Sequence, residues 1–129
     1  MLPGPPIRSY RDLDVWRLAR RLVREIYEAT AGFPPSEARS LTDQLRRAAV
    51  SVAANIAEGH GRRLATFHYH VGVARGSANE IDSHLQLAAD VGYLDAALHR
   101  RLGSRVARLA RMLTALDHAL TARRARGRP

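Results

Sequence analysis

The stretch from Leu41 to Arg62, LTDQLRRAAVSVAANIAEGHGR, most constrains how this chain can fold. Its apolar residues recur every three or four positions, which places them on one face of an α-helix. These residues are Leu41, Leu45, Ala48, Ala49, Val52, Ala53 and Ile56. Because alanine is small, such a face lets neighbouring helices approach closely. We therefore predict the central helix of a bundle, which begins at Leu41 after a capping box of Ser40 and Asp43, or earlier at Ser36, and closes at Gly59 and Gly61.

A row of polar residues runs along one flank of this helix. It consists of Gln44, Ser51, Asn55 and Glu58, at steps of seven, four and three. Half-buried amide, hydroxyl and carboxylate groups need hydrogen-bond partners, either on another helix of the same chain or on another copy of it. We favour a network within the chain, which fixes the register of the helices, over a ligand-binding row.

A further helix is expected over Thr66–Asp90, where apolar residues alternate spacings of four and three as in a coiled coil. Gly72 and Gly76 lie one turn apart and lack side chains, so we expect another helix to pack closely there, with Ser77 available for hydrogen bonds. Such packing would offset the helix stability of about 1 kcal/mol that each glycine costs relative to alanine.

The remaining helices flank these two in the sequence. Asp12 is placed to cap the first helix, and Asp95 caps the last helix, expected from Ala96 to about Ala122. We predict an all-α fold, an antiparallel up-down four-helix bundle over residues 10–122. A flexible N-terminal arm, residues 1–9, precedes the bundle, and a basic disordered tail, residues 123–129, follows it.

The stretch QLRRAAVSVAANIAEGHGR, with FPPSE before it and ARGSANEI after it, resembles the four-helix-bundle family encoded within intervening sequences of bacterial 23S rRNA genes. The resemblance covers roughly Tyr10 to Leu120 and includes the LDVWRLA opening and the GYL turn. Two departures stand out. This chain has Arg39 and Ser40 where the family commonly has Tyr-Gly, and Ala53 where it has proline, so we expect a straighter central helix.

The family also includes proteins similar to the accessory variability determinant of diversity-generating retroelements, which associates with a reverse transcriptase and nucleic acid. The resemblance therefore implies a ring-shaped homo-oligomer, a homopentamer of small helical bundles with a basic surface. It implies no known catalytic activity.

Charge is the main functional indication in the residues themselves. The chain has 21 basic residues, all arginine, against 12 acids, and a formal net charge of +9. Residues 95–129 carry a net charge of +7, which concentrates the expected basic surface at the C-terminal end. The predicted nucleic-acid-binding residues are Arg100, Arg101, Arg105, Arg108 and Arg111 on the last helix and Arg123, Arg124, Arg126 and Arg128 in the tail. No aromatic residue lies there, so binding should be largely nonspecific.

Catalytic and metal-binding patterns are missing from the sequence. It has no cysteine, no lysine for a phosphate-binding loop, and no Glu-x-x-His pair of the kind that di-iron bundles use. The GHGRR segment, residues 59–63, could hold a phosphate, but glycine at a helix end is more often a cap. We expect no enzyme activity, no cofactor and no metal. No secretion signal or membrane helix is recognisable, so we expect a cytoplasmic protein without a membrane partner.

We therefore predict a non-catalytic protein that binds RNA or DNA and serves as an adaptor for a nucleic-acid-processing partner. The alternative is a homo-oligomeric scaffold whose arginines meet an acidic protein partner.

Overall fold

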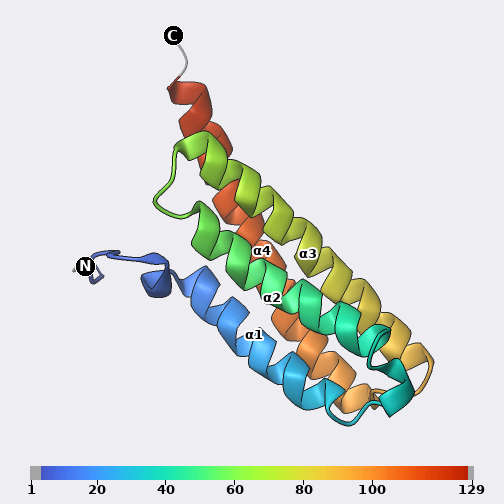
Figure 1. Ribbon diagram of the computed structural model, residues 1–129. Coiled ribbons are helices and arrows are strands. Elements are labelled where there is room, and N and C mark those ends of the chain that lie inside the picture. Colours follow the sequence, from blue (N-terminus) through green and yellow to red (C-terminus); the bar gives the residue numbers. More distant parts are fainter. Residues whose placement is uncertain (1–3, 128–129) are drawn as a thin grey trace.

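Four α-helices account for most of residues 4–127, the part of the chain that the computed structural model describes. They are α1 (Asp14–Thr30), α2 (Leu41–Gly59), α3 (Leu64–Asp90) and α4 (Ala96–Arg126), with short 3₁₀ turns η1 (Tyr10–Asp12) and η2 (Pro35–Glu37). The helices alternate in direction, and each packs on the next in the chain, with α4 returning to lie beside α1 (Figure 1). The predicted antiparallel four-helix bundle is confirmed.

The core is built most densely between α2 and α3. Val52 and Ile56 of α2 and Val71 and Ile81 of α3 are fully buried, and alanines fill the space between them. The contact between α1 and α4 is the least extensive of the four contacts between neighbouring helices. The predicted apolar faces of the second and third helices are thus the faces that meet in the bundle.

The first two helices begin differently from the expectation. Asp12 does not cap α1; its carboxylate accepts hydrogen bonds from the backbone N–H groups of Arg8 (2.8 Å) and Ser9 (3.2 Å) and so closes a capping box around η1. Helix α2 does begin at Leu41, but Ser40 makes no capping bond. Glu37 of η2 takes that role, because its Oε2 accepts from the Leu41 N–H at 3.2 Å.

The last helix begins as predicted and runs past its expected end. Asp95 caps α4 by accepting from the Leu98 N–H at 2.7 Å. The helix then continues to Arg126, so the expected disordered tail is wrong for residues 123–126. One reason is that Arg124 donates a hydrogen bond to His68 Nδ1 of α3 (3.0 Å), which holds the final turns against the bundle. Arg128 lies outside the described residues.

The polar row on α2 divides into two parts. Ser51 Oγ lies 2.8 Å from Ser77 Oγ of α3, and the Asn55 amide donates to the Ser51 carbonyl at 2.8 Å. His70 Nδ1 of α3 extends this network through a 2.9 Å contact with Asn55 Oδ1, a partner that we did not predict. Gln44 and Glu58 are exposed, and Glu58 pairs instead with Arg62 on the surface at 2.7 Å.

The glycines of α3 are not sites of close packing within the bundle, contrary to the prediction. Gly72 and Gly76 lie on the outer face of α3, and a Cβ built on either meets no atom within 4 Å. The close approach occurs at Gly59, the last residue of α2. A Cβ there would lie 2.8 Å from the Cβ of His70 and 3.0 Å from a ring carbon of Phe67, so α2 and α3 converge at this end because Gly59 has no side chain.

Among the described residues, no helix has both the length and the apolar composition needed to cross a membrane.

We expect Gly59→Ala to lower the free energy of unfolding by about 1–3 kcal/mol, because the added methyl group collides with the side chains of α3. Gly103→Ala is the matched control. Its Cβ would meet nothing within 4 Å, so helix propensity should raise the stability by up to about 1 kcal/mol. Urea denaturation followed by circular dichroism measures both effects, and a stabilising effect of Gly59→Ala would contradict the close-packing assignment.

Candidate nucleic-acid interface

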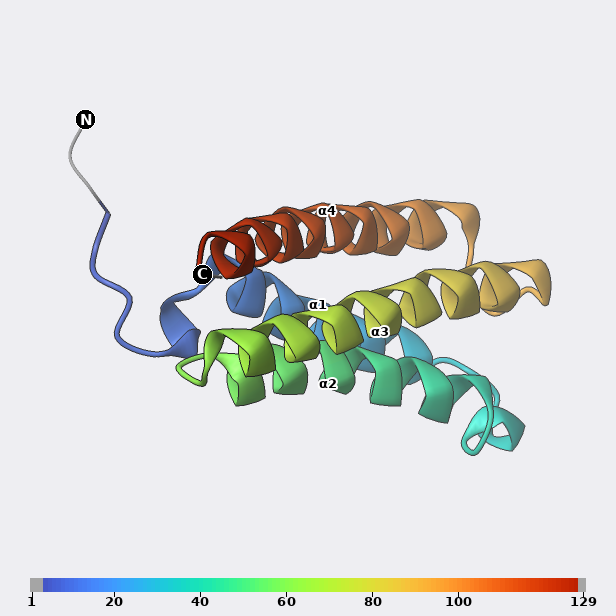
Figure 2. The ribbon, with the colours of Figure 1, turned by 90° about the horizontal axis from the view of Figure 1, so that it is seen from above.

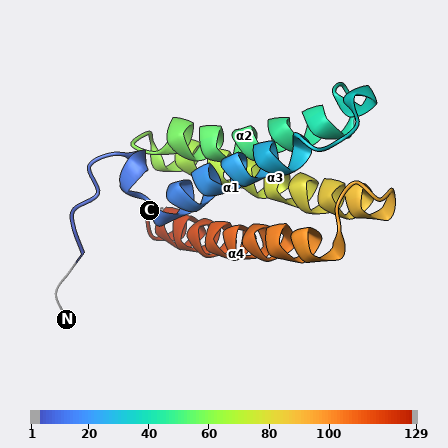
Figure 3. The same cartoon turned by 90° about the horizontal axis from the view of Figure 1, so that it is seen from below.

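The arginines gather on one side of the bundle. Helices α1 and α4 together hold twelve of the 21 arginines and four of the twelve acids, whereas α2 and α3 together hold three arginines and five acids. Because α1 and α4 lie side by side, their charges combine into one basic side, opposite a weakly acidic one (Figures 2 and 3). The basic surface is thus not confined to the C-terminal end, where we predicted it, but includes the arginines of α1.

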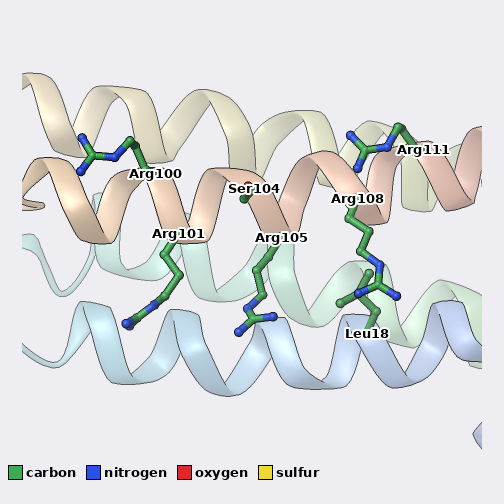
Figure 4. Close-up of a pocket in the computed structure, with 7 residues that line it drawn as sticks. All are labelled: Leu18, Arg100, Arg101, Ser104, Arg105, Arg108 and Arg111. Atoms are coloured by element: carbon green, nitrogen blue, oxygen red, sulfur yellow. The ribbon is translucent and has the colours of Figure 1, made fainter.

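An open groove of about 560 Å³ runs between α4 and α1. Its lining consists of Leu18 from α1 and, from α4, Arg100, Arg101, Ser104, Arg105, Arg108 and Arg111 (Figure 4). Arg101, Arg105 and Arg108 point from α4 towards α1, whereas Arg100 and Arg111 point away from α1 (Figure 4). The structure therefore brings five of the predicted arginines to one groove, although their side chains fan out to both sides of α4.

Arg21 of α1 is not part of this lining, but it lies on the face of α1 that meets α4. Leu18 lines the groove and Glu25 contacts Arg105, so both residues face α4. Arg21 lies three residues after Leu18 and four residues before Glu25, so it is on the same face of the helix. Its side chain is exposed. We call Arg21, Arg100, Arg101, Arg108 and Arg111 the arginine face. No carboxylate of residues 4–127 forms an ion pair with any of them.

Arg105 differs from its neighbours because it is paired inside the groove. Its Nε lies 2.7 Å from Oε1 and 2.9 Å from Oε2 of Glu25, and only Oε2 has the alignment of a hydrogen bond. The Glu25 side chain is only 15% exposed. Arg105 thus links α4 to α1 and has little free charge for a phosphate.

The arginines near the C-terminus also separate by role. Arg123 and Arg126 are exposed, whereas Arg124 is tied to His68. A guanidinium can only donate, so His68 Nδ1 accepts and the proton of the neutral ring is on Nε2, which contacts Asp117 Oδ1 at 3.0 Å. Asp117 also pairs with Arg75 at 3.1 Å. Arg124 therefore belongs to a polar cluster between α3 and α4 and stands apart from the arginine face.

No group of three or more His, Cys, Asp or Glu side chains suited to a metal ion occurs within the described range of 4–127.

The four-helix architecture is shared with known proteins. A family model described as 23S rRNA-intervening sequence protein matches residues 11–115, which include the whole arginine face but not Arg123 or Arg126. The chain is also similar to a solved structure, a protein of unknown function from the S23 ribosomal protein family of Bacteroides thetaiotaomicron VPI-5482. The two share 20% identity with a TM-score of 0.68, over 80% of this chain and 97% of that one, which shows a common fold. No curated protein matches the chain.

We expect Arg105→Gln to lower the free energy of unfolding by about 1–3 kcal/mol, because it leaves the mostly buried Glu25 carboxylate without its cation. Arg101→Gln, on the same helix but without an ion pair, should change the stability by less than about 0.5 kcal/mol. In a Glu25→Gln background the cost of Arg105→Gln should largely disappear, which a double-mutant cycle by urea denaturation measures. Equal costs in both backgrounds would show that the pair does not hold α1 to α4.

Proposed function

The chain belongs to the 23S rRNA-intervening sequence protein family, and from this premise we propose that it is a non-catalytic cytoplasmic protein that binds RNA or DNA through its arginine face. The observation that carries the proposal is the arginine face, whose five exposed guanidinium groups lie along or beside an open groove and form no ion pair with a carboxylate of residues 4–127. Arg111 lies ten residues after Arg101, which corresponds to about 15 Å along the helix axis. That length matches about four phosphates of one strand of a duplex, which recur every 3.4 Å or so.

The chemistry of this face suits the backbone of a nucleic acid more than its bases. Guanidinium groups bind phosphate oxygens in a bidentate manner and displace condensed counterions. Helix α4 has no aromatic residue for stacking and no asparagine or glutamine to contact adenine. Binding at this face should therefore depend strongly on salt and weakly on sequence, as an adaptor for a nucleic-acid-processing partner requires.

We expect the affinity of the intact protein for a duplex to fall with salt at a log-log slope of about −4 to −5, which corresponds to roughly five phosphate contacts. The triple variant Arg101→Gln, Arg108→Gln, Arg111→Gln should reduce the magnitude of that slope by about 2.7. Fluorescence anisotropy with a labelled duplex at several salt concentrations measures both values.

The matched control removes three positive charges from outside the arginine face. Arg39, Arg47 and Arg62 are exposed and lie before, on and after α2, so their joint replacement by glutamine changes the net charge equally. This control should retain most of the slope. If both triple variants lose the same affinity, net charge and not the arginine face governs binding; if the intact protein binds no nucleic acid at physiological salt, the proposal fails.

The alternative is a scaffold whose arginine face meets an acidic protein partner. Both hypotheses use the same guanidinium groups, so a competition experiment between nucleic acid and the acidic partner distinguishes them. If the protein is such a scaffold, excess nucleic acid does not displace the acidic partner; if the arginine face binds nucleic acid, excess nucleic acid displaces a partner that occupies this face.

We also propose that the chain assembles with itself, in five copies as the family resemblance implies. The outer face of α3 supports this proposal. Tyr69 and Leu87 are 67% and 48% exposed, and Gly72 and Gly76 lie between them on the same helix face. The two glycines would let a helix of another copy approach closely, and the exposed apolar residues on either side would be buried in that contact. Both glycines thus remain predicted interface residues, now between copies.

Light scattering during size-exclusion chromatography should give about five times the 14.3 kDa chain mass, because one repeated heterologous contact closes into a ring. Gly76→Leu should lower that mass without changing the helical content of the chain, since the leucine side chain would project from the outer face of α3 and meet no atom of its own bundle. A monomer at all concentrations of the intact protein would contradict the ring, and an unchanged mass for Gly76→Leu would place the contact elsewhere.

A further inference from the structure

A second groove, of about 380 Å³, lies on the other side of α1, between α1 and α2. Its apolar lining includes Trp16, Val23 and Val50, with Ala54 and Ala57 of α2 as the floor. The small side chains of α2 leave this space open. Its volume falls within the range of about 300–1,000 Å³ that is typical of small-molecule sites.

Cations stand at the edge of this apolar groove. Arg20 and Arg24 line it, and the Arg20 guanidinium lies 5.8 Å from the centroid of the Trp16 ring. No carboxylate within residues 4–127 forms an ion pair with either arginine. The groove thus combines two aromatic rings, Tyr10 and Trp16, with an apolar floor and unpaired positive charge.

A neighbouring depression continues the charged edge. It shares Trp16 and Arg20 with the groove and adds Arg11, Arg17 and Asp12. Asp12 is its only acid, and the backbone hydrogen bonds from Arg8 and Ser9 lower the pKa of its carboxyl, so that it is ionised at neutral pH. Its charge is already held by those two N–H groups and by Arg17, 3.6 Å away. It therefore opposes a bound anion only weakly.

We propose that the groove between α1 and α2 takes an unpaired base of a single-stranded nucleic acid, with the adjoining phosphates on Arg20 and Arg24. This inference rests on the proposed function and names its substrate class. A base offers an apolar face for Trp16 and the alanine floor, and the phosphates on either side of it match the two guanidinium groups. A base paired within a duplex is stacked and cannot enter the groove.

The position of α1 connects the two sites. Arg20 and Arg24 lie on its α2 side and Arg21 on its α4 side, so a strand that crosses this one helix, about 10–12 Å wide, reaches the arginine face. A single strand would then gain contacts that a duplex on the arginine face lacks.

The protein carries its own probe for this inference, because Trp16 is the only tryptophan of the chain. Titration with a single-stranded 15-nucleotide RNA should quench the Trp16 emission as a base stacks beside the ring. An abasic strand of the same length, inorganic polyphosphate and a duplex should bind, as seen by competition for a labelled oligonucleotide, without the same quenching. Equal quenching by the abasic strand would overturn the proposal.

A pair of neutral variants tests the groove itself. Ala54 is exposed on the groove floor, so Ala54→Gln fills the groove without a charge change or a folding defect. It should weaken single-strand binding about 5- to 150-fold, the range that corresponds to the loss of one stacked base. The salt slope and the affinity for the duplex should stay the same. Ala97→Gln, at an exposed alanine near the start of α4, should behave like the unaltered protein.

The outcomes separate this inference from the function on which it rests. If the duplex still binds but Ala54→Gln does not weaken single-strand binding, the base site is wrong and the arginine face stands. If neither nucleic acid binds, the proposed function fails. If acrylamide cannot quench Trp16 in the free protein, another copy of the chain covers the groove and the base site is likewise wrong.

Discussion

The close contact between α2 and α3 is the constraint on which the rest of the bundle depends. Ala48 and Ala49 of α2 and Ala74 and Ala78 of α3 are almost fully buried, and side chains this small bring two helices together at the short end of the usual packing distances. Gly59 removes the last side chain that would separate them. At that distance two serine hydroxyls, the shortest polar side chains available, can meet directly, which fixes the register of the helices at the Ser51–Ser77 hydrogen bond.

Helices α1 and α4 pack on this inner pair and carry most of the charge. A surface with many arginines and few acids repels itself, and that repulsion lowers the stability of the compact state. The bundle limits this cost in two ways. The arginines of the face are exposed, so salt and water screen them over a Debye length of about 8 Å. The most enclosed of the groove arginines, Arg105, is neutralised by Glu25, and this ion pair reinforces the least extensive of the four helix contacts.

The helices and their inward faces could be predicted from the sequence because apolar periodicity depends only on local spacing. Start and end residues were less predictable, since Glu37 and Asp12 accept from backbone groups that the folded turns bring to them. The tail shows the same limit: composition indicated disorder after residue 122, but His68, more than fifty residues earlier, holds Arg124 in a helix. The arginine face was found only in part, because Arg21 joins it through helix order rather than through sequence proximity. The up-down topology already implied that order, since it makes the first and last helices neighbours.

Helix α1 is the shortest of the four, yet both candidate binding surfaces include it. The reason lies in its position at the edge of the inner pair. It buries one stripe of residues, which includes Leu22 and Ile26, and leaves the rest of its circumference to solvent. One exposed flank meets the arginines of α4. The other meets the alanines of α2, whose small side chains suit the close packing of α2 on α3 and, where they face α1, leave a groove beside Trp16. The same choice of small residues thus builds the core on one side of α2 and opens a surface on the other.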